Sequence, residues 1–225
     1  TLTMSIKPDD EGSEFCFVIN GVKIFAMGAN YIPQDNFLSR ISPERTEELI
    51  KSAIDANFNC LRVWGGGYYP EDEFYELCDQ YGIMVWQDFA MACRLYPETE
   101  SFKNLLFDEA VKVIRKLRNH PSIILWSGDN EIDQVISSIY DPNNNTLTRE
   151  VLPTAVRLND IGRPYLASSP YISSEAYKKR GSAVTYPEDH LWGPRDYFKS
   201  DYYKNSRAHF VSETGYFGCP SIESL

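Results

Sequence analysis

Short apolar runs alternate along the chain with longer stretches whose apolar residues recur on one helical face. A run of four to eight apolar residues bounded by turn residues predicts a buried strand, and a striped stretch predicts a helix packed on a sheet. The predicted strands cover residues 15–19, 22–30, 59–64, 83–89, 122–126, 163–167, 183–186 and 210–213. The predicted helices run from residue 42, with Ser42 as the N-cap, to about residue 58, over residues 71–81 with Gly82 as the stop, and over residues 101–119 and 148–158. Leu105 and Leu106 are expected to face inward on the 101–119 helix.

Strands that alternate with helices in this way imply an α/β fold with a parallel sheet and right-handed crossovers. We expect a (β/α)8 TIM barrel whose first strand is the end of the 22–30 run. This count gives seven barrel strands, so the barrel is expected to be incomplete, truncated before its last strand. Residues 1–21 read as a remnant of a preceding β-sandwich or an N-terminal hairpin, because Asn20-Gly21 is a strong two-residue turn signal, and residues 22–225 as the barrel.

Composition narrows the possible partners. The chain has 225 residues and a net charge of −10, which argues against a nucleic-acid partner because such proteins need a basic surface. No apolar segment reaches 18 residues and no signal-peptide pattern opens the chain, so we expect a soluble protein without a membrane partner. Its compartment stays open between periplasmic, secreted and lysosomal types.

Histidine and cysteine patterns predict neither a metal nor another cofactor. The chain contains three histidines, none paired at i, i+4, and five cysteines without CxxC spacing. Cys16, Cys60 and Cys78 fall within apolar runs or helical stripes and read as buried free thiols.

Two glutamates stand at the ends of predicted strands. Glu131 ends the stretch PSIILWSGDNE at residues 121–131, and Glu213 ends the run FVSE at residues 210–213. In a parallel α/β barrel the carboxyl ends of the strands converge on the active site. Two carboxyl groups that face each other there are the minimum needed to cleave a glycosidic bond. The alternative is that each is an ordinary strand-end glutamate that pairs with a lysine or arginine.

Several motifs, in order along the chain, resemble glycoside hydrolase family 2, in particular the catalytic domain of its β-mannosidase-like branch. They are GANYIPQDNF at 28–37, LRVWGGGYYPEDEFYELCDQYGIMVWQDFAMACRLYP at 61–97, HPSIILWSGDNE at 120–131, RPYLASSP at 163–170, DHLWG at 189–193 and FVSETG at 210–215. The resemblance implies retaining hydrolysis of terminal β-mannosyl or related β-glycosyl residues from an oligosaccharide or glycoside.

The resemblance also implies roles for individual residues. Glu131 would be the general acid/base, Glu213 the nucleophile, and Asn130 would bind the sugar 2-hydroxyl. Glu131 must then carry a proton before the first step, which requires a raised pKa, while Glu213 must stay ionised among hydrogen-bond donors. Further candidates for substrate binding are the possible sugar platforms Trp64 and Trp192 and the possible hydroxyl contacts Asp35, Arg62, Asp88 and His190.

Other residues of these motifs allow alternative interpretations. The three glycines at 65–67 predict a ligand-facing loop, whereas Trp86 and Trp126 lie within apolar runs and should fill the core. Asp129 stands where family members often have Asn, and this carboxylate would raise the pKa of Glu131 if it pointed into the site.

Three functional alternatives remain at this stage. The chain could be a non-catalytic carbohydrate-binding barrel, or a hydrolase of β-glucosaminides or β-galactosides. In a glucosaminidase, Asp129 or Asp88 would face the substrate ammonium. Family members carry flanking domains that are missing here, so this fragment could be inactive, and an open barrel edge favours a homo-oligomer.

Overall fold

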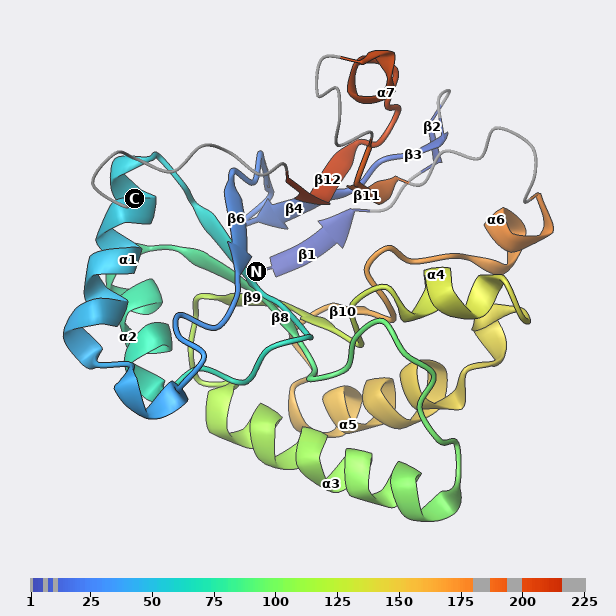
Figure 1. Cartoon of the computed structure of the whole chain (residues 1–225), viewed down its shortest axis with the longest axis horizontal. Coiled ribbons are helices and arrows are strands. Elements are labelled where there is room, and N and C mark those ends of the chain that lie inside the picture. The colour runs from blue at the N-terminus through green and yellow to red at the C-terminus, as the bar shows by residue number, and fades with distance from the viewer. Residues whose placement is uncertain (1, 6–7, 10–11, 180–186, 194–199, 216–225) are drawn as a thin grey trace.

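The computed structural model describes residues 2–5, 8–9, 12–179, 187–193 and 200–215 (Figure 1). A five-stranded parallel sheet has the order β10-β9-β8-β7-β6. A separate parallel pair joins β11 to β12. These seven strands are β6 (Gly28–Tyr31), β7 (Cys60–Val63), β8 (Met84–Asp88), β9 (Ile123–Ser127), β10 (Tyr165–Leu166), β11 (Glu188–Leu191) and β12 (Phe210–Thr214).

The longer of the helices that connect the strands cover the outer face of the five-stranded sheet. The longer ones are α1 (Pro43–Asp55), α2 (Asp72–Tyr81), α3 (Glu100–Leu117) and α5 (Leu152–Asn159), and a π-helical segment, η3 (Leu147–Val151), leads into α5. The shorter ones are η1 (Leu38–Arg40), α4 (Ile132–Ser137), η2 (Pro142–Asn144), α6 (Ser174–Lys178) and α7 (Asp201–Lys204). The predicted end signals hold: Ser42 Oγ accepts from Arg45 N–H at the start of α1, and Gly82, with φ +73°, ends α2.

The N-terminal residues form their own antiparallel sheet in the order β1-β4-β5. Its strands are β1 (Leu2–Ser5), β4 (Cys16–Ile19) and β5 (Val22–Ile24), and a small ribbon pairs β2 (Pro8–Asp9) with β3 (Gly12–Ser13). Asn20 and Gly21 both have positive φ, +51° and +84°, as expected in a two-residue hairpin turn. The run at 22–30 therefore divides, because residues 22–24 pair with β4 whereas residues 28–31 pair with β7.

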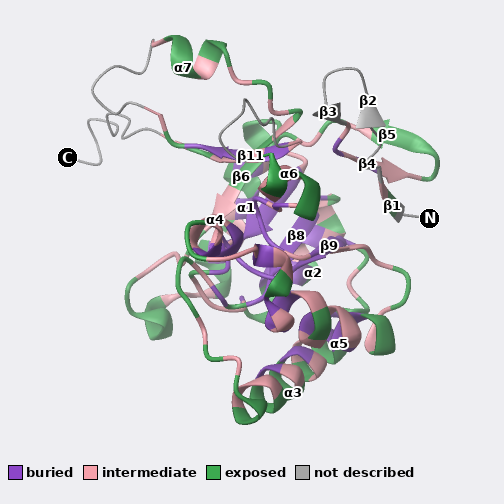
Figure 2. Cartoon of the chain, turned by 90° about the vertical axis from the view of Figure 1, so that its right-hand side faces the viewer, coloured by how far each residue is buried: buried purple, intermediate pink, exposed green. Residues whose placement is uncertain are grey.

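Two apolar cores lie on opposite faces of the parallel sheet, and the strands between them are buried (Figure 2). The outer core packs Trp126 and the other outward-facing strand residues against the helices. The inner core fills the barrel, where Phe15 and Phe17 of the N-terminal segment contact Trp86 of β8 and Phe210 of β12. The N-terminal hairpin thus plugs the end of the barrel where Cys60 and Met84 begin their strands.

Most predicted elements are confirmed, with a few differences. β11 at Glu188–Leu191 was not predicted as a strand, and the strand predicted at 183–186 lies outside the described residues. Leu105 was expected to face inward on α3, but its side chain is 64% exposed, because the buried stripe of this helix runs through Leu106, Ala110, Ile114 and Leu117. Trp86 and Trp126 are buried, as expected.

A seam separates β6 from β12. Among the described residues β6 pairs with β7 alone and β12 with β11 alone. A cavity of about 510 Å³ lies along this seam, lined by residues of both strands together with Arg62, Trp64, Trp86 and Trp192. Glu213 lines one end of the cavity, which therefore opens at the carboxyl ends of the strands. No helix in the described part of the chain has the length and apolar character required to cross a membrane.

Candidate active site

Glu131 and Glu213 come from opposite sides of the barrel mouth. Glu131 follows β9 and immediately precedes α4, with a left-handed backbone of φ 62°. Such a backbone costs a non-glycine residue on the order of 1 kcal/mol or more, so neighbouring bonds must hold it. Glu131 N–H donates to Ser169 O, and Asp129 Oδ1 accepts from Ile132 N–H at the start of α4. Glu213 lies within β12.

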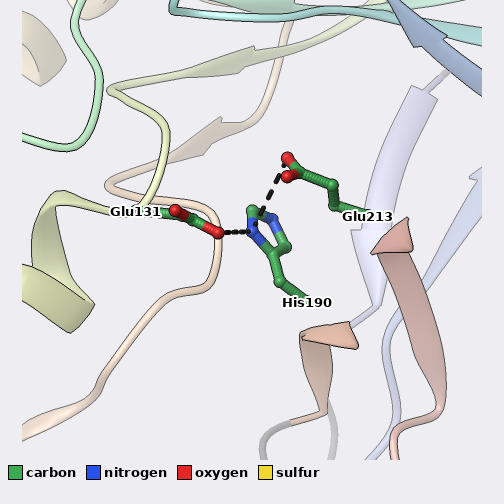
Figure 3. A group of neighbouring side chains, drawn as sticks. All are labelled: Glu131, His190 and Glu213. Atoms are coloured by element: carbon green, nitrogen blue, oxygen red, sulfur yellow. Dashed lines mark hydrogen bonds and ion pairs between the residues drawn. The ribbon is translucent and has the colours of Figure 1, made fainter. Parts of the chain in front are cut away.

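The side chain of His190 lies between the two carboxyl groups (Figure 3). Its Nδ1 is 2.8 Å from Glu131 Oε1 and 3.6 Å from Glu213 Oε2. One side-chain oxygen of each glutamate and one ring nitrogen all lie within 4.8 Å of one another. The two carboxyl groups therefore face the same small volume, as the sequence predicted, and His190 of β11 occupies part of it.

Arg62 on β7 connects most of the site. Its Nη1 donates to Glu213 Oε2 at 2.8 Å and to Asn30 Oδ1 at 3.1 Å. Its Nη2 donates to Asp88 Oδ2 and to Asn130 Oδ1, each at 2.8 Å. The guanidinium is 4% exposed, so these charge-assisted bonds form away from water, where they are stronger than at a surface. Arg62 thereby fixes the nucleophile candidate relative to the end of β9.

The second oxygen of Glu213 has a donor of its own. Trp192 Nε1 donates to Glu213 Oε1 at 3.0 Å, while 42% of the Trp192 surface remains exposed at the seam cavity. Each oxygen of Glu213 thus accepts a hydrogen bond, one from Arg62 and one from Trp192.

The pKa of Glu131 is lowered in this structure, whereas its predicted role as the acid requires a raised pKa. The hydrogen bond with His190 lowers the pKa of this carboxyl, and the charge of His190, the Cys93 thiol and Arg62 act in the same direction. Partial burial opposes them by raising the pKa. Without a bound substrate, Glu131 is therefore held as a carboxylate against the imidazole.

Asp88 has an internal partner for each oxygen. It is 1% exposed and accepts from Arg62, from Trp86 Nε1 at 2.9 Å and from Gly65 N–H at 3.0 Å. Asp88 was predicted to contact a sugar hydroxyl, but in this structure it binds and positions Arg62. Burial raises the pKa of Asp88, and Arg62 opposes that shift.

The glycines at 65–67 serve close packing within the chain. A Cβ on Gly65 would lie 2.6 Å from Met91 O, and one on Gly66 would lie 2.1 Å from the Trp64 ring. The loop that was predicted to face a ligand therefore packs against the Trp64 ring and against the residues that follow β8. Trp64 still lines the seam cavity beside Arg62.

Asp35 lies outside both this hydrogen-bond network and the seam cavity. Its carboxylate pairs with Arg40 at 2.6 Å and accepts from Phe37 N–H at 2.7 Å. Both bonds stabilise the loop before η1. They involve none of the residues that contact Glu131 or Glu213.

The network also includes residues that were not predicted as contacts, among them Cys93, Ser169, Glu188 and Asn30, each in a motif quoted above or directly beside one. Cys93 Sγ lies 3.5 Å from Glu131 Oε2 and accepts from Asn130 Nδ2 at 3.3 Å. Ser169 Oγ lies 3.0 Å from His190 Nε2 and donates to Glu188 Oε1 at 2.6 Å. Asn30 joins the network through Arg62. Only tertiary contact reveals them, because none of the four is a strand-end acid.

Asp129 points away from the site. Its Oδ1 accepts from Ser168 Oγ at 2.5 Å as well as from Ile132 N–H, and the side chain is fully buried. The neighbouring Asp133 forms a bidentate pair with Arg149 at 2.6 and 2.7 Å. Burial and the charge of Asp133 raise the pKa of Asp129 well above its usual value. Asp129 therefore supports the turn that carries Glu131 and does not face it.

Asp129→Asn should stabilise the chain at neutral pH. A carboxyl whose pKa is higher in the folded state than its unfolded value of about 3.9 contributes stability at low pH and loses it as the pH rises. Asn keeps an acceptor for Ile132 and Ser168 and cannot ionise. We expect a melting temperature a few degrees above that of the wild type at pH 7.5, with the gain shrinking toward pH 4. Thermal unfolding across this pH range measures the gain.

Asp133→Asn is the control. It breaks the pair with Arg149 and should therefore lose stability. A gain in Asp129→Asn that does not depend on pH would contradict the interpretation.

Comparison with known proteins identifies the family of the chain. The family model for the TIM barrel domain of glycosyl hydrolases family 2 matches residues 14–164. A β-mannosidase of Capra hircus is 39% identical over 95% of this chain and 26% of its own length. A β-mannosidase B of Aspergillus niger is 45% identical over 57% of this chain and 15% of its own. The crystal structure of a β-D-mannosidase from Dictyoglomus thermophilum superimposes with a TM-score of 0.86 at 38% identity, covering 98% of this chain and 28% of that one.

This chain spans about a quarter of the length of the β-mannosidases that it matches over most of its own length. The match includes the strands that carry Arg62, Asp88 and Glu131. By its sequence and its parallel barrel architecture, the chain belongs to glycosyl hydrolases family 2, as a TIM barrel domain of that family.

Proposed function

We propose that this chain is the catalytic domain of a retaining exo-β-mannosidase that releases non-reducing terminal β-mannosyl residues. The observation that carries the proposal is the approach of the Glu131 and Glu213 carboxyl oxygens to within 4.8 Å. Retaining glycosidases place their two carboxyl groups about 5 Å apart, whereas inverting ones need about 6.5–9.5 Å to admit a water. The choice of mannose rests on the named activity of the relatives.

The reaction proceeds by two displacements at the anomeric carbon. In the first, Glu213 attacks that carbon while Glu131 gives its proton to the departing glycosidic oxygen, so the aglycone leaves as an alcohol and a glycosyl ester forms. In the second, Glu131, now a carboxylate, takes a proton from water as the water oxygen attacks the same carbon and Glu213 departs. Two inversions give net retention.

Substrate binding must alter the environment of Glu131 before the first step. The hydrogen bond from His190 is the largest cause of its lowered pKa. A sugar that separates His190 from Glu131 Oε1 removes this effect and adds further burial, which raises the pKa. In the proposed cycle His190 therefore holds Glu131 ionised in the free enzyme and releases it when the site is filled.

Arg62 and Asn130 orient the reacting groups. Arg62 fixes Asn130 Oδ1, which directs the Asn130 Nδ2 donor toward Cys93 Sγ. Sulfur is a weak acceptor, so a sugar 2-hydroxyl can replace it at low cost. This contact strengthens as the ring flattens toward the oxocarbenium-like transition state.

The structure disfavours two of the alternatives. A non-catalytic binding barrel has no need of two opposed carboxyl groups or of a buried guanidinium that fixes one of them. For a glucosaminidase, Asp129 and Asp88 were the acids suggested to meet the ammonium, but both are buried and both accept hydrogen bonds from within the chain. A β-galactosidase differs from a β-mannosidase in hydroxyl contacts, so substrate trials decide between them.

We further propose that the chain divides into an N-terminal hairpin and a barrel. The expected boundary between residues 1–21 and 22–225 moves, because β5 (Val22–Ile24) pairs with β4, so the hairpin extends to Ile24 and the barrel begins with β6 at Gly28. Additional chain or a second copy would cover the seam between β6 and β12. The relatives are about four times as long, and their further domains are the expected partners. Unpaired parallel edges are otherwise prone to association.

The test is the anomeric configuration of the first product. We expect the chain to release mannose from an aryl β-mannoside as the β-anomer, detected by proton NMR before mutarotation, and to act more slowly on matched β-galactosides and β-glucosaminides. The α-anomer as first product would exclude the double displacement. A faster reaction on another sugar would move the proposal to that sugar while leaving the carboxyl pair in place.

A further inference from the structure

We propose that Glu131, His190 and Glu213 also form a binding site for a zinc ion, which closes the hydrolytic site when it binds. The sequence predicted no metal because no histidine pairs with another along a helix. The barrel instead brings the three ligands together from three separate strand ends. This zinc site goes beyond the proposed hydrolase function and would exist even if the natural substrate were a different sugar.

The distances suit zinc. Zinc binds imidazole nitrogen and carboxylate oxygen at about 2.0–2.2 Å in a tetrahedron, which separates neighbouring ligand atoms by about 3.3 Å. His190 Nδ1 lies 2.8 Å from Glu131 Oε1 and 3.6 Å from Glu213 Oε2, on either side of that value. A zinc ion between them would take the place of the contact between Nδ1 and Oε1, and small movements of the two glutamates would complete the geometry.

The far side of His190 has the form of an outer shell around a metal. Metal-bound histidines almost always donate their second ring N–H to a polar neighbour, which fixes the ring. His190 Nε2 lies 3.0 Å from Ser169 Oγ and 3.8 Å from Glu188 Oε1, and Ser169 in turn donates to Glu188. The imidazole side chain is 1% exposed, so it is held with Nδ1 directed at the two glutamates.

Charge favours a cation at this position. The carboxylates of Asp88 and Glu213 pair directly with the guanidinium of Arg62. The carboxyl groups of Glu131 and Glu188 lie near enough to interact with it electrostatically, so four carboxyl groups share this one described cation. Imidazole with two carboxylates suits zinc, whereas magnesium prefers oxygen ligands in a strict octahedron and keeps several waters. Because zinc would engage both Glu131 and Glu213, it must compete with a sugar that needs both.

The experiment is calorimetric titration of the chain with zinc chloride in a non-chelating buffer, beside a titration with magnesium chloride. We expect one zinc site per chain and no comparable magnesium binding. Glu131→Gln is the decisive variant, since its partly exposed side chain can change without disturbing the core. Zinc affinity should fall about tenfold or more in Glu131→Gln, in Glu213→Gln and in His190→Asn.

A matched control uses another histidine–carboxylate pair, His120 with Asp79 at 2.6 Å. His120→Asn should leave zinc affinity unchanged. Zinc binding that disappears in Cys93→Ser but persists in Glu131→Gln would overturn the proposal by assigning the metal to the thiol. Absence of zinc binding to the wild-type chain would also overturn it, and neither result would affect the anomer test of the hydrolase.

Discussion

Glu213→Gln should lower kcat for an aryl β-mannoside by about 10⁴-fold or more, as losses of catalytic nucleophiles do. Glutamine keeps an acceptor for Trp192 Nε1 but loses the charge that faces Arg62, so no glycosyl ester can form. The loss should be similar for good and poor leaving groups, because bond formation to the anomeric carbon fails in each case. Steady-state kinetics with a series of substituted aryl mannosides measures it.

Glu131→Gln provides the matched control for that experiment. Its loss should depend on the leaving group: small in the first step for acidic phenols, which depart without a proton, and large for poor leaving groups. Both glutamates come from the same barrel mouth, so a difference between the two variants reports their roles and not their location. Substantial turnover by Glu213→Gln without an added nucleophile would refute the mechanism.

Arg62→Met should be the most destabilising single change at the site. It would leave the buried Asp88 carboxylate and the Glu213 carboxylate without their shared cation. Removal of one partner from a buried ion pair typically costs about 3–5 kcal/mol. We expect a corresponding fall in the free energy of unfolding, measured by urea denaturation at pH 7.

Two other substitutions distinguish the loss of the buried Arg62 contacts from a general loss of positive charge. Arg62→Lys keeps the cation but cannot reach Asp88, Asn130 and Glu213 with one ammonium, so it should fold and lose activity by about 10²-fold. Arg40→Met removes the exposed pair with Asp35 and should cost at most about 1 kcal/mol. Equal destabilisation by Arg62→Met and Arg40→Met would show that the buried network contributes little.

Local patterns were sufficient where a residue's neighbours in sequence control its structure. Ser42 and Gly82 mark helix ends, Asn20-Gly21 forms the hairpin turn, and Ile123 to Trp126 forms a buried strand, all as predicted. Hydrophobic periodicity predicted the structure less well where one apolar run contributes to two different sheets or where a helix stripe is broad. The 22–30 run divides between two sheets, and Leu105 faces solvent, because the helix stripe can be placed in more than one way.

The candidate site shows the same division. The two glutamates could be found because each directly ends an apolar run, and a parallel sheet brings such ends together. The roles of Asp88 and Asp129 could not be found in this way, since an acid after a strand faces a ligand in some sites and an internal donor in others. Asp88 binds Arg62, and Asp129 supports the turn into α4.

The amino-acid order alone was enough for the alternating architecture, for the family and for the pair of candidate catalytic carboxyls, because these depend on short-range periodicity and on motifs with fixed spacing. Three features emerged only from the folded chain: the bridge of His190 between Glu131 and Glu213, the four-way contact of Arg62, and the plug formed by Phe15 and Phe17. Each joins residues distant in sequence, and such contacts depend on how the strands close around a common axis, which no local pattern specifies.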